Sequence, residues 1–282
     1  MKNPILLCLL VILTACVSQE LFPQSDTGDR LTVPLSDPSR PAFLKVGLIS
    51  GSITVEGHSG KEILVEGKTG REDDDEERES EKTAKTRGLH RIANTSTGLT
   101  VEEDNNEVTV GTGAMGASRT INLTIKVPPK TSMKLSTINN GEINVSHVNG
   151  DLEASNTNGS IAISDVNGSA VVDALNGNIT VTFTGVNPQK SMSFSSLNGT
   201  IDVTFPSDVR ATVRMKTEQG EIYSDFDIKM SNSTANMEQN ELGKRGKYRV
   251  TLEKMMTGTI NGGGAEVQFK NFNGDIYIRK GK

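Results

Sequence analysis

The stretch NGEINVSHV-NGDLEASNT-NGSIAISDV-NGSAVVDAL-NGNITV, residues 140–181, repeats an Asn-Gly pair every nine residues. Counted from each glycine, apolar residues recur at positions +2, +4 and +7, as at Ile161, Ile163 and Val166. A fixed repeat of this length indicates a stack of similar structural units. Because these spacings break the strict alternation of a straight strand, each unit is predicted to turn a corner.

Asn-Gly pairs are also strong hairpin signals, so an antiparallel meander is the competing interpretation. Successive strands of a meander run in opposite directions, and nothing then requires each strand to repeat the same directional pattern. A chain that turns in one sense after every short strand does require it. The repeat therefore predicts an all-β fold, a single-stranded parallel β-helix (β-solenoid) with short strands and Asn-Gly corners.

The corners are predicted at the Asn-Gly pairs, because glycine tolerates the positive φ of a tight corner and asparagines can stack on those of neighbouring units. Positions +2 and +4 would face inward from a strand, and position +7 would fill the corner. The predicted corner residues are Asn140, Gly141, Asn149, Gly150, Asn158, Gly159, Asn167, Gly168, Asn176, Gly177, Asn198, Gly199, Asn273 and Gly274. Similar units outside the strict block extend the predicted solenoid over residues 43–280.

The first residues of the chain are typical of a secretory signal. Lys2 supplies a positive charge, and the apolar run that follows is too short to span a bilayer. Leu13-Thr14-Ala15-Cys16 resembles the bacterial lipobox, in which cleavage before the cysteine leaves it carrying acyl chains. We therefore expect a lipoprotein signal peptide at residues 1–15, with an ordinary secretory signal as the alternative. The lipidated Cys16 would begin a polar, proline-spaced flexible tether over residues 16–42.

This resemblance to lipoproteins implies a place in the cell envelope. The membrane partner would be reached through acyl chains on Cys16, since more than one chain gives stable anchoring. Val17 and Ser18 follow the cysteine, without the Asp that would argue against outward sorting. We expect the outer membrane if the host has two membranes.

Composition narrows the function further. The net charge is −5, with 30 Lys+Arg against 35 Asp+Glu, which leaves no basic stripe for a nucleic-acid partner. Aromatic residues make up only 4% of the chain, so we expect aliphatic packing inside. Residues 71–81 contain eight acids in eleven positions without the spacing of a calcium loop. They indicate an acidic, disordered insertion near residues 68–90.

No catalytic residue, metal site or cofactor is predicted. His58, His90 and His147 lie in separate segments, which argues against a zinc site. The nine-residue calcium β-roll needs a glycine run and an aspartate in every unit, and the repeat has neither. An outward row of Asp165, Asp173 and Asp202 could serve an enzyme acting on polysaccharide, although solubilising charges are the simpler interpretation.

Three further segments carry a family resemblance: FPSDVRATV at 205–213, GEIYSDF at 220–226 and NGDIYIRK at 273–280. Together with the repeats they resemble the bacterial "putative adhesin" β-strand-repeat domain family of unknown function. The resemblance implies a parallel β-helix and supplies no catalytic residues. We therefore expect a lipid-anchored, non-enzymatic envelope protein that presents its solenoid for adhesion, scaffolding or interaction with an envelope or surface protein or glycan. A polysaccharide-acting β-helix enzyme of the envelope and a self-assembling structural module are the alternatives.

Overall fold

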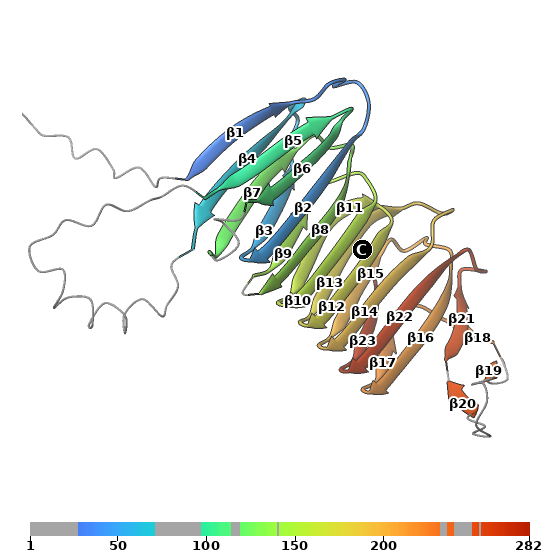
Figure 1. Cartoon of the computed structure of the whole chain (residues 1–282). Helices are drawn as coiled ribbons and strands as arrows, with labels where there is room; N and C mark the ends of the chain where they lie inside the picture. The colour runs from blue at the N-terminus through green and yellow to red at the C-terminus, as the bar shows by residue number, and fades with distance from the viewer. Residues whose placement is uncertain are drawn as a thin grey trace, which may run out of the picture.

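The computed structural model describes residues 28–70, 97–113, 119–139, 141–231, 236–239, 250–253 and 255–282. These residues form two large sheets that face each other along an elongated stack (Figure 1). Sheet A has ten strands in the order β1 (Asp29–Pro34), β4 (Glu62–Thr69), β7 (Ile121–Val127), β3 (Ile53–Gly57), β9 (Ile143–Ser146), β11 (Ile161–Gly168), β13 (Ile179–Val186), β15 (Ile201–Phe205), β23 (Ile276–Lys280) and β17 (Ile222–Ser224).

Sheet B has eleven strands in the order β18 (Lys229–Met230), β21 (Met256–Ile260), β16 (Ala211–Gln219), β22 (Ala265–Asn273), β14 (Met192–Asn198), β12 (Ala170–Asn176), β10 (Leu152–Asn158), β8 (Thr131–Asn139), β2 (Ala42–Ser50), β6 (Glu107–Thr112) and β5 (Leu99–Asp104). A separate antiparallel pair joins β19 (Asn236–Gln239) to β20 (Val250–Glu253).

The chain winds through the two sheets in one sense. It passes from β8 in sheet B to β9 in sheet A and on to β10 in sheet B, and each strand pairs in parallel with the strand one turn later. Ile143 pairs with Ile161, and Ile161 pairs with Ile179, so one turn takes eighteen residues. Each nine-residue repeat is therefore half a turn. These parallel pairs exclude the meander, and the predicted parallel β-solenoid is confirmed.

The interior lies between the sheets. The repeat positions that face it are not the same in every strand. In the sheet A repeats of β9 and β11 the predicted positions are buried, as at Ile161, Ile163 and Val166, whereas the repeats of β13 and β15 bury position +6, at Phe183 and Phe205. In the sheet B repeats position +6 is buried instead of +7, so Ala174 is inside and Leu175 is 44% exposed. The physical reason is a β-bulge in β11 next to Asp165, whose φ is 52°, which shifts the inward register by one residue. Strand β12 has no such bulge and keeps its alternation through Leu175.

The interior is also less uniformly aliphatic than we expected. Phe183, Phe194, Phe205 and Phe269 pack together between the sheets, with ring centroids 5.3–6.4 Å apart. All four are buried. A low overall aromatic content thus conceals a local aromatic centre, because half of the eight phenylalanines gather in one part of the stack.

The order of the turns in space differs from their order in the chain. A turn is one strand of sheet B followed by one strand of sheet A, such as β10–β11. The turn β2–β3 lies between β6–β7 and β8–β9, and the turn β22–β23 lies between β14–β15 and β16–β17. At each end the chain therefore runs outward and later returns, and parallel pairing is kept throughout these turns.

Among the described residues, antiparallel strands cover one end of the parallel stack in both sheets and the other end in sheet B. At one end β4 pairs antiparallel with β7 and β1 with β4, while β5 pairs antiparallel with β6. At the other end β21 pairs antiparallel with β16. The pairing of β1 corrects one expectation, because residues 29–34 form a sheet strand instead of a flexible tether. The described part of the solenoid accordingly begins before residue 43.

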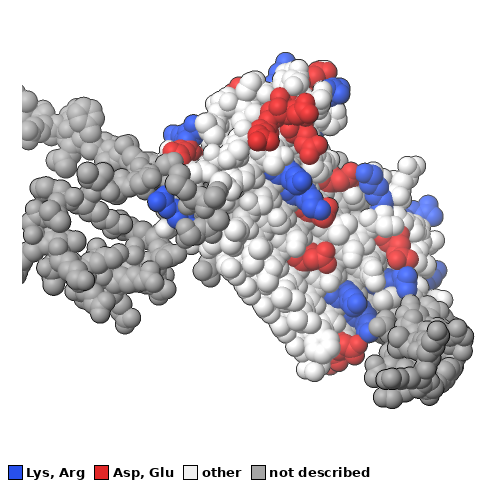
Figure 2. Space-filling model, in the orientation of Figure 1, with Lys and Arg blue, Asp and Glu red and all other residues white. Residues whose placement is uncertain are grey.

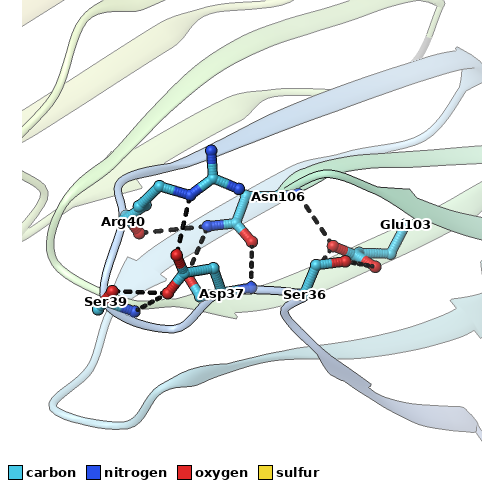
Figure 3. A network of polar contacts seen from close by, with 6 residues as sticks. All are labelled: Ser36, Asp37, Ser39, Arg40, Glu103 and Asn106. Atoms are coloured by element: carbon cyan, nitrogen blue, oxygen red, sulfur yellow. Dashed lines mark hydrogen bonds and ion pairs between the residues drawn. The ribbon is translucent and has the colours of Figure 1, made fainter.

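A network of polar contacts fixes the connection from β1 to β2 against the β5–β6 turn (Figure 3). The side-chain amide of Asn106 donates to the backbone carbonyl of Asp37 at 2.6 Å, and its oxygen accepts from the Asp37 backbone N–H at 2.8 Å. The Glu103 carboxylate accepts from the backbone N–H groups of Ser36 and Asn106, both at 3.0 Å. Asn106 is buried with a φ of 70°, a conformation that asparagine adopts more readily than most residues. The network therefore closes this end of the stack.

Candidate functional site: a groove on the outer face of sheet B

The outer face of sheet B carries rows of equivalent residues that run along the solenoid axis. Such rows arise because parallel strands in register place the same repeat position at every turn, ~4.8 Å apart. Position +5 contributes mostly small or polar side chains: Gly47, Ser136, Ser155, Asp173, Ser195 and Lys270. Position +7 contributes mostly large apolar ones: Ile49, Ile138, Thr157, Leu175, Leu197 and Phe272.

Small residues beside large ones make a groove. Over β10, β12, β14 and β22 it has a volume of about 490 Å³. We call Ser155, Asp173, Ser195 and Lys270 the floor of the groove, and Thr157, Leu175, Leu197 and Phe272 its wall. The groove crosses the strands, so it runs along the length of the molecule.

The wall belongs to a longer apolar ridge on the protein surface. Ile49, Ile138, Leu175, Leu197 and Phe272 are each 41–47% exposed. At the spacing of neighbouring strands the ridge extends about 24 Å from β2 to β22. In Figure 2 the margin of this face where the sheet B strands end is largely white, and the charged side chains lie further back along the strands. A mostly apolar row of this kind, interrupted at Thr157 on β10, marks an interaction site more often than isolated exposed leucines do.

A ladder of asparagines runs beside the ridge at the next residue position. The side-chain amide of each donates to the side-chain oxygen of its neighbour: Asn158 to Asn139 at 3.2 Å, Asn176 to Asn158 at 3.0 Å, Asn198 to Asn176 at 2.8 Å and Asn273 to Asn198 at 2.7 Å. The partners are thus two repeat units apart within the strict block. Stacked amides of this type restrain the strand ends from which the ridge projects.

Asp173 is the acidic group of the floor. Although its side chain reaches solvent, partial desolvation between the neighbouring strands raises the pKa of Asp173. The nearby Glu153 carboxylate adds to this increase, and a hydrogen bond with Ser195 opposes it. Glu153 forms an ion pair with Lys134 at 2.6 Å. The floor therefore combines hydroxyl groups with a single carboxylate and the ammonium group of Lys270.

The predicted glycine corners lie where the chain passes between the sheets. A Cβ on Gly159 would stand 1.9 Å from the carbonyl oxygen of Gly141, and a Cβ on Gly177 would stand 2.1 Å from that of Gly159. Positive φ, the reason predicted for glycine, occurs at four of the seven predicted corner glycines: Gly159, Gly168, Gly199 and Gly274. At Gly177, whose φ is not positive, the close approach of the preceding turn is what requires glycine.

Two predicted residues, Asn140 and Cys16, lie outside the described residues, as does the acidic stretch at 71–90. Residues 68 and 69, placed in the predicted insertion, belong to strand β4 instead. In the described segments of the chain, His, Cys, Asp and Glu side chains form no group able to hold a metal ion. The same segments contain no helix that is long and apolar enough to cross a membrane.

The three outward aspartates do not form the acidic row that the enzyme alternative requires. Asp173 lies on sheet B, whereas Asp202 lies on sheet A and pairs with Arg279 at 2.7 Å. Asp165 sits at the bulge of β11, 3.6 Å from the imidazole of His147. The two sheets turn their outer faces away from each other, so Asp173 cannot act on one substrate together with Asp165 or Asp202.

A stacked tyrosine pair on sheet A was not predicted. The rings of Tyr223 and Tyr277 lie 5.1 Å apart and nearly parallel, and Arg279 lies over the Tyr277 ring. A hydrogen bond to Glu221 raises the pKa of Tyr223 to about 12. The signal was present in the sequence, because both tyrosines follow the pattern Gly-x-Ile-Tyr. Each hydroxyl donates to the carboxylate two residues earlier in the chain, Glu221 for Tyr223 and Asp275 for Tyr277, so the pair is already partnered.

The comparison with family models identifies the central part of the chain. Residues 153–261 match the Toastrack domain, DUF4097. The predicted family resemblance is confirmed over these residues. The Toastrack segment includes most of the groove, from Ser155 to Leu197, and ends before β22 supplies Lys270 and Phe272.

Among curated proteins, none matches the sequence. A solved structure of "a putative cell adhesion protein" from Clostridium sporogenes ATCC 15579 aligns with 90% of this chain and 100% of its own, at 11% identity and a TM-score of 0.45.

Proposed function

We propose that this protein is a lipid-anchored, non-enzymatic component of the bacterial envelope that binds an extended partner in the sheet B groove. The observation that carries the proposal is the exposed apolar wall beside a polar floor, repeated over four neighbouring strands. Every one of these strands is paired on both sides, so the groove is held on a rigid surface. Rigid regular elements position a binding surface better than loops do.

The anchoring part rests on the lipobox-like sequence ending at Cys16. Strand β1, the first strand in the described residues, begins at Asp29, which would leave a short segment between an acylated Cys16 and the sheets. A solenoid attached in this way would stand close to the membrane, with its outer faces directed to the envelope space. The net charge of −5 would not draw the protein to anionic lipid, so the acyl chains would supply the attachment.

Anchoring is tested by metabolic labelling of the full chain with a fatty-acid analogue, followed by fractionation of the envelope. We expect the wild type to be labelled and membrane-bound, and Cys16→Ala to be unlabelled and absent from the membrane fraction. Cys8→Ala is the matched control, because it changes the only other cysteine and lies within the predicted signal peptide. An unlabelled wild type, or a membrane-bound Cys16→Ala, would refute lipid anchoring.

The enzyme alternative is favoured by one observation, the raised pKa of Asp173 in a groove. Hydrolysis of a glycosidic bond usually needs two carboxylates that flank it. Glu153, whose charge contributes to the raised pKa of Asp173, would be the second carboxylate. Release of soluble sugar from a polysaccharide by the wild type, and its loss in Asp173→Asn, would replace the non-enzymatic proposal. We expect no such release.

A further inference from the structure

The direction and repeat of the groove restrict what can fill it. It runs across the strands, and its floor and wall recur once per turn, ~4.8 Å apart. An extended peptide rises ~3.3 Å per residue with side chains on alternating sides, so it would fall out of step with this repeat. A linked pyranose ring lengthens a polysaccharide by a distance close to one turn. A linear glycan can therefore place one ring over each successive strand.

Backbone pairing also argues against a peptide that adds to the sheet. Peptides recognised by strand addition bind to a free sheet edge through their main chain. Strands β10, β12 and β14 have a parallel neighbour on each side, as does β22. Their backbone groups are used within the sheet, and a ligand in the groove can bind only through side chains.

The charges of the floor suit a neutral ligand. Ser155 and Ser195 offer hydroxyl groups, while Asp173 and Lys270 bring one negative and one positive charge. An anionic polymer would need several cations along its path, and the floor has one. Hydroxyl groups of a sugar can donate to the carboxylate and accept from the ammonium group and the serines.

The wall supplies the complementary apolar contact. Leu175, Leu197 and Phe272 present aliphatic and aromatic surface at consecutive turns, with Phe272 44% exposed. A pyranose ring has C–H groups on its faces, and these pack on such surface while the equatorial hydroxyls point to the floor. Binding sites that combine apolar lining with a few placed polar groups are the usual arrangement for small ligands.

We infer that the sheet B groove binds one strand of a neutral linear polysaccharide, which lies along the solenoid axis with its hydroxyls on the floor and its ring faces on the wall. The inference rests on the proposed binding function and specifies its partner class. The stacked tyrosines on sheet A are not part of this site, because they lie on the opposite outer face.

The test is co-sedimentation of the full detergent-solubilised chain with insoluble cellulose, chitin and β-1,3-glucan. We expect the wild type to sediment with at least one of them, independently of added salt. Leu197→Ser removes the middle of the wall and should weaken binding about tenfold, which corresponds to about 1.4 kcal/mol. Leu31→Ser is the matched control, because Leu31 is an equally exposed leucine (42%) on sheet A and its loss should leave binding unchanged.

Circular dichroism and thermal melting check that both variants stay folded. If Leu197→Ser unfolds, Asp173→Asn, which changes one exposed side chain of the floor, serves as the groove variant instead. Absence of sedimentation with all three glycans overturns the inference, and so does binding that survives both groove variants. An arm with immobilised casein separates the two proposals. Capture of the wild type by casein alone, weakened by Leu197→Ser, overturns the glycan inference and leaves the proposed binding groove standing. If the wild type binds neither the glycans nor casein, both the glycan inference and the proposed binding groove are overturned.

Discussion

Replacing Phe194 by alanine should remove a large share of the stability of the stack. Phe194 is fully buried, stacks on Phe269 at 5.3 Å, and meets Phe183 and Phe205 edge-on at 6.3 and 6.4 Å. Deleting a buried phenylalanine side chain costs about 3–5 kcal/mol through lost burial and the cavity left behind. Loss of three aromatic contacts places the expected change at the upper part of that range.

The assay is urea unfolding of the full chain followed by far-UV circular dichroism, with amide hydrogen exchange at β14 and β22. Because each turn of a solenoid contacts mainly its neighbours, exchange should rise first at these two strands. Phe272→Ala is the matched control on β22, since this ring is 44% exposed and its removal should cost less than about 1 kcal/mol. Equal losses for the two variants, or a loss below about 1 kcal/mol for Phe194→Ala, would refute the packing argument.

Two further predictions concern a corner and the polar network. Gly159→Val should destabilise the chain by roughly 3–5 kcal/mol, because φ is 148° and a Cβ would meet the Gly141 carbonyl at 1.9 Å. Gly111→Val, where a Cβ meets nothing within 4 Å, should be near neutral in the same urea assay, and similar costs for both would contradict the corner geometry. Hydrogen bonds from the backbone N–H groups of Ser36 and Asn106 and from the Ser36 hydroxyl lower the pKa of Glu103. A lowered folded pKa gives stability above the ordinary value of ~4.3 that is lost as pH falls through the folded value. Amide exchange at Ser36 should therefore accelerate in acid, and Glu103→Gln should remove that pH dependence; unchanged exchange in acid would count against it.

The parallel winding was predictable because the directional repeat has only one simple structural solution. The two-sheet arrangement was not, because units on the two sheets carry the same Asn-Gly signal and the same apolar residues at +2 and +4. The third inward residue does not separate the sheets either, because it lies at +6 in β13 of sheet A as it does in the sheet B strands. The bulge beside Asp165 moves it to +7 in β11, and this shift depends on backbone geometry. Leu175 therefore carries the same sequence signal as Val166, whereas the folded chain places it on the surface.

The groove could be anticipated only after the turns were aligned. Ser136, Ser155 and Ser195 occupy the same repeat position, and the residues two positions later, Ile138, Thr157 and Leu197, belong to the row that forms the ridge and the wall. In the linear sequence these residues are 19 and 40 positions apart, and the units between them carry different residues. Lys270 and Phe272 could not be placed in this alignment from the sequence, because their strand β22 lies next to β14 although other strands come between the two in the chain.

That late insertion has a consequence for synthesis. Strands β14 and β16 emerge from the ribosome before β22, which later occupies the slot between them. Until β22 is made, the backbone N–H and C=O groups along one edge of β14 and one edge of β16 have no hydrogen-bonding partner. Unpaired strand edges of this kind promote aggregation of nascent chains. A polypeptide stopped after residue 264 should accordingly pellet with aggregates during translation, while the full-length product stays in the supernatant; equal recovery of both would show that the slot closes by itself.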